Sequence, residues 1–229
     1  MPVAIVTGGS RGLGEALAAG LLDRGWSVVT DARDAGALAA TADRLRAAGV
    51  LVALPGDVTD AGHRRELVAA ATALGPLGLV VNNAGGLGPS PLPNLADYPL
   101  EPLSELFDAN VTAPLALIQE ALPALRAAGG VIVNITSDAG VEGYPGWGGY
   151  GATKAALDQL TRVLAAEEPD VAVYAIDPGD LRTRMHQDAF PGEDISDRPL
   201  PETSVPGILA IVDQRPASGR YQAREQVST

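Results

Sequence analysis

The stretch "VAIVTGGSRGLGEALAAGLL", residues 3–22, joins a short apolar run to a helical pattern through a glycine-containing turn. β-Branched residues favour a strand in its first part, and Ala and Leu favour a helix in its last part. Gly8, Gly12 and Gly14 permit a sharp turn and let backbone amides approach a phosphate, while the helix N-terminus adds partial positive charge. A tight turn of this kind needs glycine in any case, so the stretch alone does not establish a phosphate site.

The alternation of strand and helix continues along the chain. Further strands are expected at "SVVTD", "VLVAL", "GLVVN", "GVIVNIT", "VAVYAI" and, at the end, near "GRYQA". Helical patterns lie at 12–24, 35–48, 60–74, about 101–127, 150–168 and near 203–212. This order predicts an α/β protein with a three-layer, doubly wound parallel sheet of about seven strands, the Rossmann fold.

Length and composition limit the organisation of the chain. It has 229 residues, of which 46% are hydrophobic, which suits one well-packed core, so residues 1–229 are expected to form a single domain. The segment 182–203 is polar and contains proline, and we expect it to be a lid over the binding site. A merely mobile surface loop has the same composition.

Several classes of function are disfavoured. Without cysteine there is neither a disulfide nor a thiolate ligand, and two histidines, His63 and His186, are too few for a metal cluster. A net charge of −12 opposes binding to nucleic acid and to anionic membranes. The N-terminal stretch shows no signal or membrane-spanning pattern, so the expected compartment is the cytoplasm.

Three further features point to chemistry at the edge of the sheet. Lys154 is the only lysine, and Tyr150 stands four positions before it on the same helical face. Ser137 ends a strand and can converge with Tyr150 on one substrate atom, and "NNAG" at 82–85 follows a neighbouring strand. Each has an ordinary explanation as well: a surface lysine, a capping serine and a turn.

Together, "TGGSRGLG", "NNAG", Ser137, "YGATK" and "PGDLRT" resemble, in this order and spacing, the short-chain dehydrogenase/reductase family. The resemblance runs from Val3 to about Thr183. It implies an NAD(P)-dependent oxidoreductase that transfers a hydride between nicotinamide and a small ketone, aldehyde or secondary alcohol. It also implies a catalytic group composed of Asn110, Ser137, Tyr150 and Lys154.

The resemblance further implies which residues bind the cofactor. The pyrophosphate would lie on the glycine turn, adenine between Asp57 and Val58, and nicotinamide beside the loop that begins at Pro178. The full set is Gly8, Ser10, Arg11, Gly12, Leu13, Gly14, Asp31, Arg33, Asp57, Val58, Asn83, Ala84, Gly85, Tyr150, Lys154, Pro178, Gly179, Leu181 and Thr183. Lys154 is also expected to lower the pKa of Tyr150, from about 10 by about two units.

NADP(H) is the expected cofactor, with NAD(H) possible, because Arg11 and Arg33 can both reach a 2′-phosphate on the adenosine ribose. In the family, the acid that selects NAD aligns with Ala32. Asp31, one position earlier, could still point at the ribose, and a shift of one residue would reverse the preference.

The remaining expectations concern the substrate and assembly. The substrate pocket is expected to be lined by "GLGPS", "VEGYPGW" and the lid residues Met185, His186 and Phe190. The family resemblance and the apolar helices at 101–127 and 150–168 favour a homodimer or homotetramer. A cofactor-binding sensor or scaffold without turnover is the alternative from another class, while the glycine spacing and short chain disfavour a sugar-nucleotide epimerase.

Overall fold

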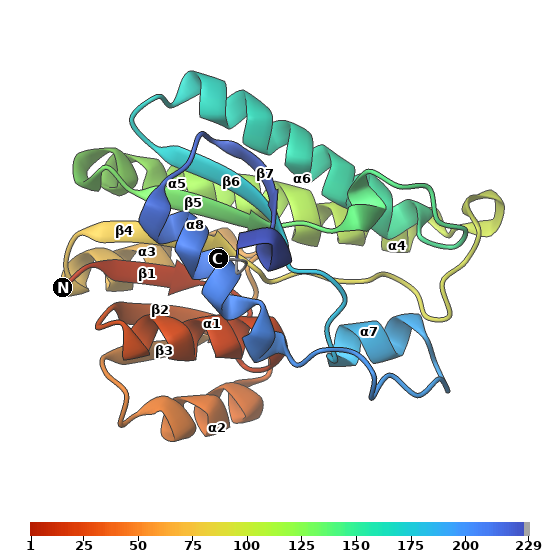
Figure 1. The fold of residues 1–229 in the computed structure, drawn as a ribbon, viewed down its shortest axis with the longest axis horizontal. Coiled ribbons are helices and arrows are strands. Elements are labelled where there is room, and N and C mark those ends of the chain that lie inside the picture. Colours follow the sequence, from red (N-terminus) through yellow and green to blue (C-terminus); the bar gives the residue numbers. More distant parts are fainter. Residues whose placement is uncertain (227–229) are drawn as a thin grey trace.

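The computed structural model describes residues 1–226, and one sheet of seven parallel strands runs through it (Figure 1). The strand order is β3-β2-β1-β4-β5-β6-β7. The strands are β1 (Val3–Val6), β2 (Ser27–Ala32), β3 (Leu51–Pro55), β4 (Leu77–Asn82), β5 (Val131–Ile135), β6 (Ala172–Asp177) and β7 (Gly219–Gln222). The helices are α1 (Gly12–Asp23), α2 (Ala35–Leu45), α3 (Ala61–Leu74), α4 (Leu100–Phe107), α5 (Ala113–Ala128), α6 (Gly148–Glu167), α7 (Arg184–Ala189) and α8 (Val205–Gln214). The predicted seven-stranded α/β fold is therefore confirmed.

Two apolar clusters cover the two faces of the sheet. One joins α1 and α8 to the sheet through residues such as Leu17 and Ile208, which are fully buried. The other joins α3, α5 and α6 to the opposite face through residues such as Leu67 and Leu117. Because both faces of the sheet are covered, β1 at its centre is apolar and buried along its whole length.

The structure differs from the sequence prediction in two segments that bear on the site. The helix predicted over 101–127 is divided into α4 and α5 by a π-helical turn at Asp108–Thr112. The segment 182–203, predicted as a loop, contains the short helix α7, capped by the Thr183 hydroxyl, which accepts a hydrogen bond from the His186 amide. Within residues 1–226, no helix combines the length and apolar character that crossing a membrane requires.

Candidate active site and cofactor cleft

The carboxyl ends of the strands open into one cleft of about 1300 Å³. All nineteen residues expected to bind the cofactor line this cleft, together with Ser137. Asn110 is the exception among the expected site residues, because it is buried behind the lining. The cleft lies where a doubly wound sheet reverses its strand order, between β1 and β4, which is the usual ligand position in such sheets.

The glycine turn presents the N-terminus of α1 to the cleft. Gly8 and Gly12 have positive φ angles of 73° and 58°, so the turn depends on glycine at both positions. No side chain caps α1 at Arg11, and Gly12, Leu13 and Gly14 line the cleft. The first amides of a helix have no intrahelical partner, so these three remain available to an anion such as a pyrophosphate.

The loop after β4 is tied to the glycine turn. The Thr7 hydroxyl accepts hydrogen bonds from the Asn83 and Ala84 amides, at 3.0 Å each, and the Asn83 side chain donates to the Thr7 carbonyl at 2.8 Å. A Cβ on Gly14 would overlap with the Gly8 carbonyl. The glycines and "NNAG" therefore fix each other's backbone, and Asn83 directs its side chain onto the turn.

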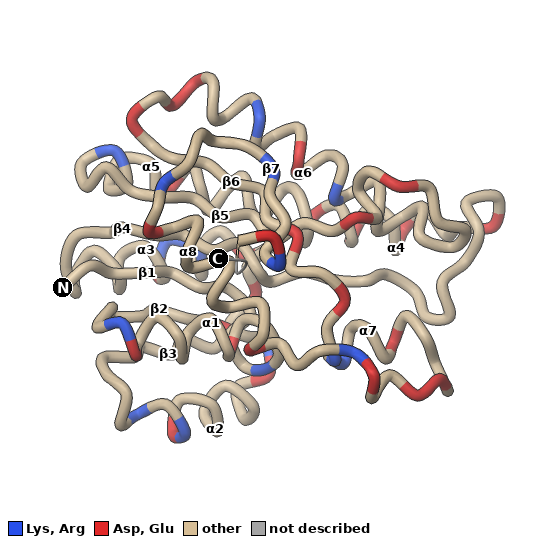
Figure 2. The backbone as a smooth tube through the Cα atoms, in the orientation of Figure 1, with Lys and Arg blue, Asp and Glu red and all other residues tan. Residues whose placement is uncertain are grey.

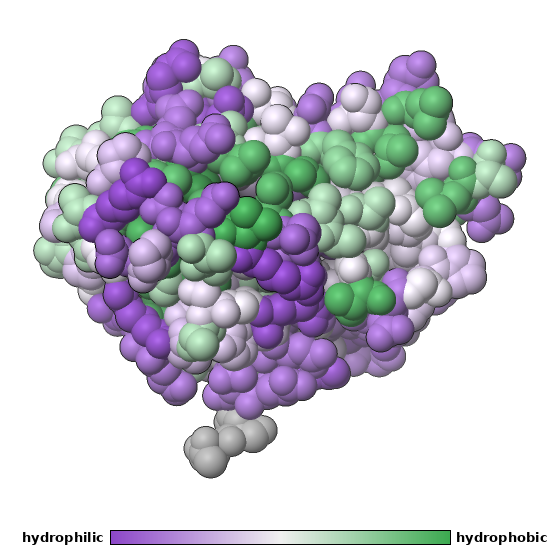
Figure 3. All heavy atoms as spheres, turned by 90° about the horizontal axis from the view of Figure 1, so that it is seen from above, coloured by the Kyte–Doolittle hydropathy of each residue, from purple (hydrophilic) through white to green (hydrophobic). Residues whose placement is uncertain are grey.

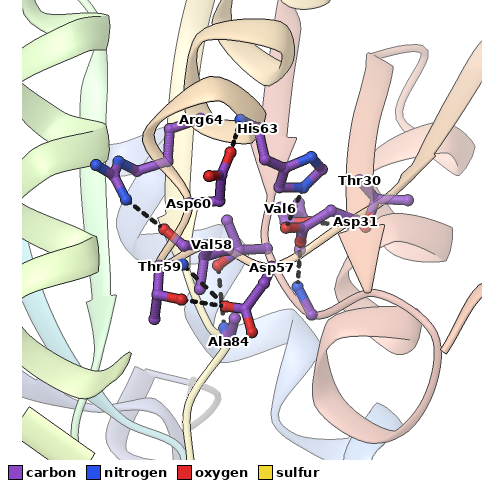
Figure 4. Close-up of polar contacts among 12 residues, drawn as sticks. Val6, Thr30, Asp31, Asp57, Val58, Thr59, Asp60, His63, Arg64 and Ala84 are labelled. Atoms are coloured by element: carbon purple, nitrogen blue, oxygen red, sulfur yellow. Dashed lines mark hydrogen bonds and ion pairs between the residues drawn. The ribbon is translucent and has the colours of Figure 1, made fainter. Parts of the chain in front are cut away.

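On the side of the cleft where adenosine is expected, the Asp57 carboxylate accepts hydrogen bonds from the amide and hydroxyl of Thr59, at 2.9 and 2.8 Å (Figure 4). Burial opposes ionisation, but these bonds, with the charge of Arg33, lower the pKa of Asp57. Arg33 is exposed, and Arg11 pairs with Asp34, its Nη2 lying 3.2 Å from Oδ2. Both arginines line the cleft at the end of β2.

Asp31 lies at the floor of this side of the cleft and is held in place by other groups. Its Oδ1 accepts a hydrogen bond from the Gly8 amide at 2.8 Å, and its Oδ2 lies 3.0 Å from Nε2 of His63. Asp31 is 1% exposed and His63 is 6% exposed. His63 follows β3 by a turn and belongs to no motif, so the sequence analysis did not identify it as a partner of Asp31.

Ser137, Tyr150 and Lys154 meet at the end of β5. Tyr150 and Lys154 both lie in the first part of α6, with Lys154 Nζ 5.4 Å from the centre of the Tyr150 ring. Lys154 Nζ also donates a hydrogen bond to the Ile135 carbonyl at 2.8 Å. The Ser137 hydroxyl donates to Asp138 Oδ1 at 3.0 Å and accepts from the Ala139 amide at 3.2 Å.

The pKa values of Tyr150 and Lys154 are shifted in opposite directions. Burial raises the pKa of Tyr150 above its ordinary value of 10, Asp177 and Asp138 act in the same direction, and a hydrogen bond with Ser137 opposes them. Burial lowers the pKa of Lys154 to about 8. The expected lowering of the Tyr150 pKa is therefore wrong, because burial and the two carboxylates raise it and the Ser137 hydrogen bond only partly opposes them. Tyr150 keeps its proton at neutral pH.

Asn110 occupies the π-helical turn between α4 and α5 and holds two other segments together. Its Oδ1 accepts from the Gly86 amide at 2.8 Å, and its Nδ2 donates to the Gly86 carbonyl and to Thr153 Oγ1, at 2.9 and 3.0 Å. Thr153 Oγ1 in turn donates to the Tyr150 carbonyl at 2.7 Å. Asn110 thus connects the loop after β4 with the start of α6.

Strand β7 supplies an arginine, Arg220, that the sequence analysis missed. Arg220 Nε lies 3.1 Å from Asp158 Oδ2, and its Nη2 lies 3.3 Å from Asp177 Oδ2 and donates to the Ser137 carbonyl at 3.1 Å. Asp177 Oδ1 accepts from the Gly179 amide at 2.9 Å. Arg220 thereby links the last strand to the end of β6, to α6 and to Ser137.

The substrate side of the cleft combines apolar and acidic groups. Trp147, Leu87 and Met185 line it, and the Trp147 ring packs edge-on against Tyr150 with centroids 5.7 Å apart. Tyr144 is 44% exposed and, like Phe190, lies outside the lining. Acidic positions outnumber basic ones along α4 and in the loop after α7 (Figure 2). Lining carboxylates on this side are Glu105, Asp108, Asp138, Asp180, Asp188 and Glu202.

Comparison with known proteins agrees with this geometry. The rhamnolipids biosynthesis 3-oxoacyl-(acyl-carrier-protein) reductase of Pseudomonas aeruginosa is 40% identical over 193 residues, covering 80% of this chain and 74% of that protein. A short-chain dehydrogenase from Shigella flexneri, solved with NADP, is 27% identical, covers 97% of each chain and has a TM-score of 0.90. An alcohol dehydrogenase from Thermococcus sibiricus, solved with 5-hydroxy-NADP, is also 27% identical, with a TM-score of 0.85, covering 97% of this chain and 95% of that one.

A family model described as short chain dehydrogenase matches residues 2–194. That range includes the glycine turn, "NNAG", Ser137 and the Tyr150–Lys154 pair, which the fold brings to one cleft. The chain therefore belongs to the short-chain dehydrogenase family of NAD(P)-dependent oxidoreductases.

Proposed function

We propose that this enzyme interconverts a small ketone or aldehyde and the corresponding alcohol with NADP(H), using Asn110, Ser137, Tyr150 and Lys154. The observation that carries the proposal is the arrangement of the last three side chains around the end of β5, beside the uncapped N-terminus of α1. That helix end, with the residues expected to bind the cofactor along one cleft, fits a dinucleotide.

In the reductive direction, a nicotinamide held in the cleft would supply a hydride to the carbonyl carbon. Tyr150 donates its phenolic proton to the oxygen that becomes negatively charged, which suits a group that is protonated at neutral pH. The Ser137 hydroxyl, at the end of β5, turns from Asp138 to donate to the same oxygen. Lys154 stabilises the tyrosinate that remains and donates to the cofactor ribose.

The test is turnover of the Tyr150→Phe variant, followed by nicotinamide absorbance with a panel of carbonyl compounds. We expect turnover to fall at least about a hundredfold while NADPH affinity changes little, because only the proton donor is lost. Near-normal turnover would contradict the proposed role. Cofactor binding by the wild-type protein without turnover on any substrate would favour the alternative of a sensor or scaffold.

The panel should contain matched neutral and carboxylated carbonyls. Six carboxylates and two arginines, Arg182 and Arg184, line the substrate side of the cleft. This excess of negative charge repels an anionic substrate. Trp147 and Leu87 provide an apolar contact surface. We therefore propose a neutral substrate with an apolar or flat body, and equal kcat/KM for the two members of a matched pair would contradict this.

The proposed preference for NADPH over NADH is supported by Arg11 and Arg33, which flank the end of β2, and by the absence of an acid at Ala32. The measurement is kcat/KM for both cofactors with one substrate. Arg33→Ala and Arg11→Ala should each reduce the preference several-fold, since each removes a cation that pairs with a 2′-phosphate. A wild-type preference for NADH, insensitive to both arginines, would overturn it.

A further inference from the structure

A buried acid and a buried imidazole lie beneath the adenosine side of the cleft, and Figure 4 shows them facing each other. Asp31 comes from the end of β2 and His63 from the first turn of α3. One Asp31 oxygen accepts from the Gly8 amide and the other lies 3.0 Å from His63 Nε2, so both carboxylate oxygens are engaged within the protein.

The backbone around His63 is shaped to hold this ring. A Cβ at Gly56 would overlap three atoms of the imidazole, so only glycine leaves room for it there. The amide of His63 donates to Asp60 Oδ1 at 2.7 Å, which fixes the first turn of α3. The imidazole is therefore confined between Gly56, at the end of β3, and Asp31. This packing fixes the orientation of the ring.

We propose that His63 determines cofactor specificity by holding the Asp31 carboxylate against Gly8 and away from the adenosine ribose. This proposal rests on the NADP(H) preference proposed above and explains how an acid beside Ala32 is compatible with it. A free carboxylate at a strand end accepts from a ribose 2′-hydroxyl and repels a 2′-phosphate. Held between the Gly8 amide and a protonated imidazole, Asp31 neither accepts from the hydroxyl nor adds net negative charge beside the phosphate.

The contact between His63 and Asp31 also gives the site a defined pH dependence. The hydrogen bond that His63 donates to the Asp31 carboxylate raises the pKa of His63, against the opposing effect of burial. The other charged groups acting on the imidazole are Glu66 and Asp60 of α3, while Asp57 lies in the loop before that helix. Below the raised pKa the protonated imidazole neutralises Asp31, and above it the pair carries one negative charge. Affinity for a 2′-phosphate should therefore fall as pH rises through that pKa.

The test compares 2′,5′-ADP with 5′-AMP, which differ only in the 2′-phosphate, by isothermal titration calorimetry without turnover. In His63→Leu, which removes the donor, the affinity ratio of the two nucleotides should fall about tenfold, because a released carboxylate lies near the phosphate. His63→Gln retains a donor and should recover part of the ratio. The double variant Asp31→Asn/His63→Leu, without the acid, should recover it fully.

Asp23→Asn is the matched control, because it removes an exposed carboxylate at the end of α1 that is not among the groups acting on the imidazole. Its ratio should equal that of the wild type. An unchanged ratio in a cooperatively folded His63→Leu would overturn the inference and leave the NADP(H) preference intact. A wild-type protein that binds both nucleotides equally would overturn the preference and the inference together.

Asp31→Asn in the wild-type background supplies a second route should His63→Leu fail to fold. Asparagine can still accept from the Gly8 amide and donate to a neutral His63, so the geometry is kept while the charge is removed. The pH dependence of the 2′,5′-ADP to 5′-AMP ratio should disappear in this variant. Persistence of that pH dependence would show that the Asp31 and His63 pair does not govern phosphate recognition.

Discussion

Lys154 is the residue whose protonation state should limit the reaction at high pH. Its pKa is lowered to about 8, so the ammonium is present below that pH and is lost above it. Tyr150, whose pKa is raised, remains protonated throughout this range. We expect kcat/KM for carbonyl reduction to be level below about pH 8 and to decline above it. The measurement is a pH profile with saturating NADPH.

Lys154→Arg provides the control for that profile. Arginine keeps its proton, so the decline near pH 8 should vanish, although activity should be low because the guanidinium is larger and planar. A profile in this variant that still declines near pH 8 would assign the transition to another group.

Arg220 lies close to two carboxylates that act on the catalytic pair. Asp158 raises the pKa of Lys154 and Asp177 raises that of Tyr150, and Arg220 contacts both acids. Arg220→Gln should destabilise the fold by about 2–4 kcal/mol, because it leaves buried acids without their cation. It should also move the alkaline decline to higher pH, since the unpaired Asp158 holds the Lys154 proton more strongly.

Arg220→Lys should restore part of both properties. The comparison variant is Arg215→Gln, which removes an arginine that bonds only the Gly129 carbonyl at the surface. If Arg220→Gln and Arg215→Gln behave alike in melting temperature and pH profile, Arg220 does not support the catalytic residues.

The sequence predicted the residues that belong to motifs and missed those that support them. Gly12, Ser137 and Tyr150 could be found because strand ends and helix starts converge at one edge of a parallel sheet. His63 and Arg220 could not, because their partners are 32 and 62 residues away and depend on side-chain geometry. The predicted effect of Lys154 on Tyr150 failed for a related reason, since the degree of burial is a property of the packed site.

At the scale of the elements, the helix predicted over 101–127 is divided into α4 and α5. Here too, contacts between distant segments decide what the local sequence pattern does not. The apolar periodicity of 101–127 predicted one helix, but the π-helical turn reflects the bonds of Asn110 to Gly86 and Thr153. Both partners lie in other segments, so periodicity could not specify the turn. The lid segment likewise folds in part into α7, whose six residues are too few for a periodic signal.

Asn110 should accordingly contribute to stability as well as to the site. Asn110→Ala leaves the Gly86 amide and carbonyl without their side-chain partners in a buried location, where Asn110 is 1% exposed. We expect a loss of about 2–3 kcal/mol in the free energy of unfolding and a fall in Tm of about 4–12 °C. Asp108→Ala, at an exposed position in the same turn, should leave Tm within about 2 °C.

An equal Tm for Asn110→Ala and the wild type, measured by differential scanning calorimetry, would show that the π-helical turn is maintained without this side chain. In that case Asn110 would matter only through contacts with water or substrate, and the loss should be confined to kcat.

At the scale of the whole molecule, the parallel sheet with helices on both faces followed from the alternation of strands and helices, because parallel strands need helical crossovers that cover both faces. Surfaces were harder to predict. The helix 150–168 was expected to offer an apolar surface for assembly, but its Leu157 is 2% exposed, and Leu164 and Ala165 pack against the core. The exposed side of α6 instead carries Ala152, Ala155, Val163 and Ala166.

This outer side of α6 supports the proposal of a homo-oligomer. Val163 is 42% exposed, and the small alanines beside it allow a second helix to approach closely. Leu100 and Leu95, near the start of α4, are 73% and 67% exposed. Figure 3, which looks onto the side of the molecule where α6 lies, shows apolar areas among hydrophilic ones.

We expect light scattering at micromolar concentration to give a mass of at least twice that of one chain. Val163→Glu should shift the protein toward the monomer, because it places a charge in the centre of an apolar contact between copies. Val50→Glu makes the same substitution at a valine that is 41% exposed before β3, and it should leave the mass unchanged. A wild-type mass equal to one chain would contradict the proposed assembly, and equal masses for the two variants would place the interface away from α6.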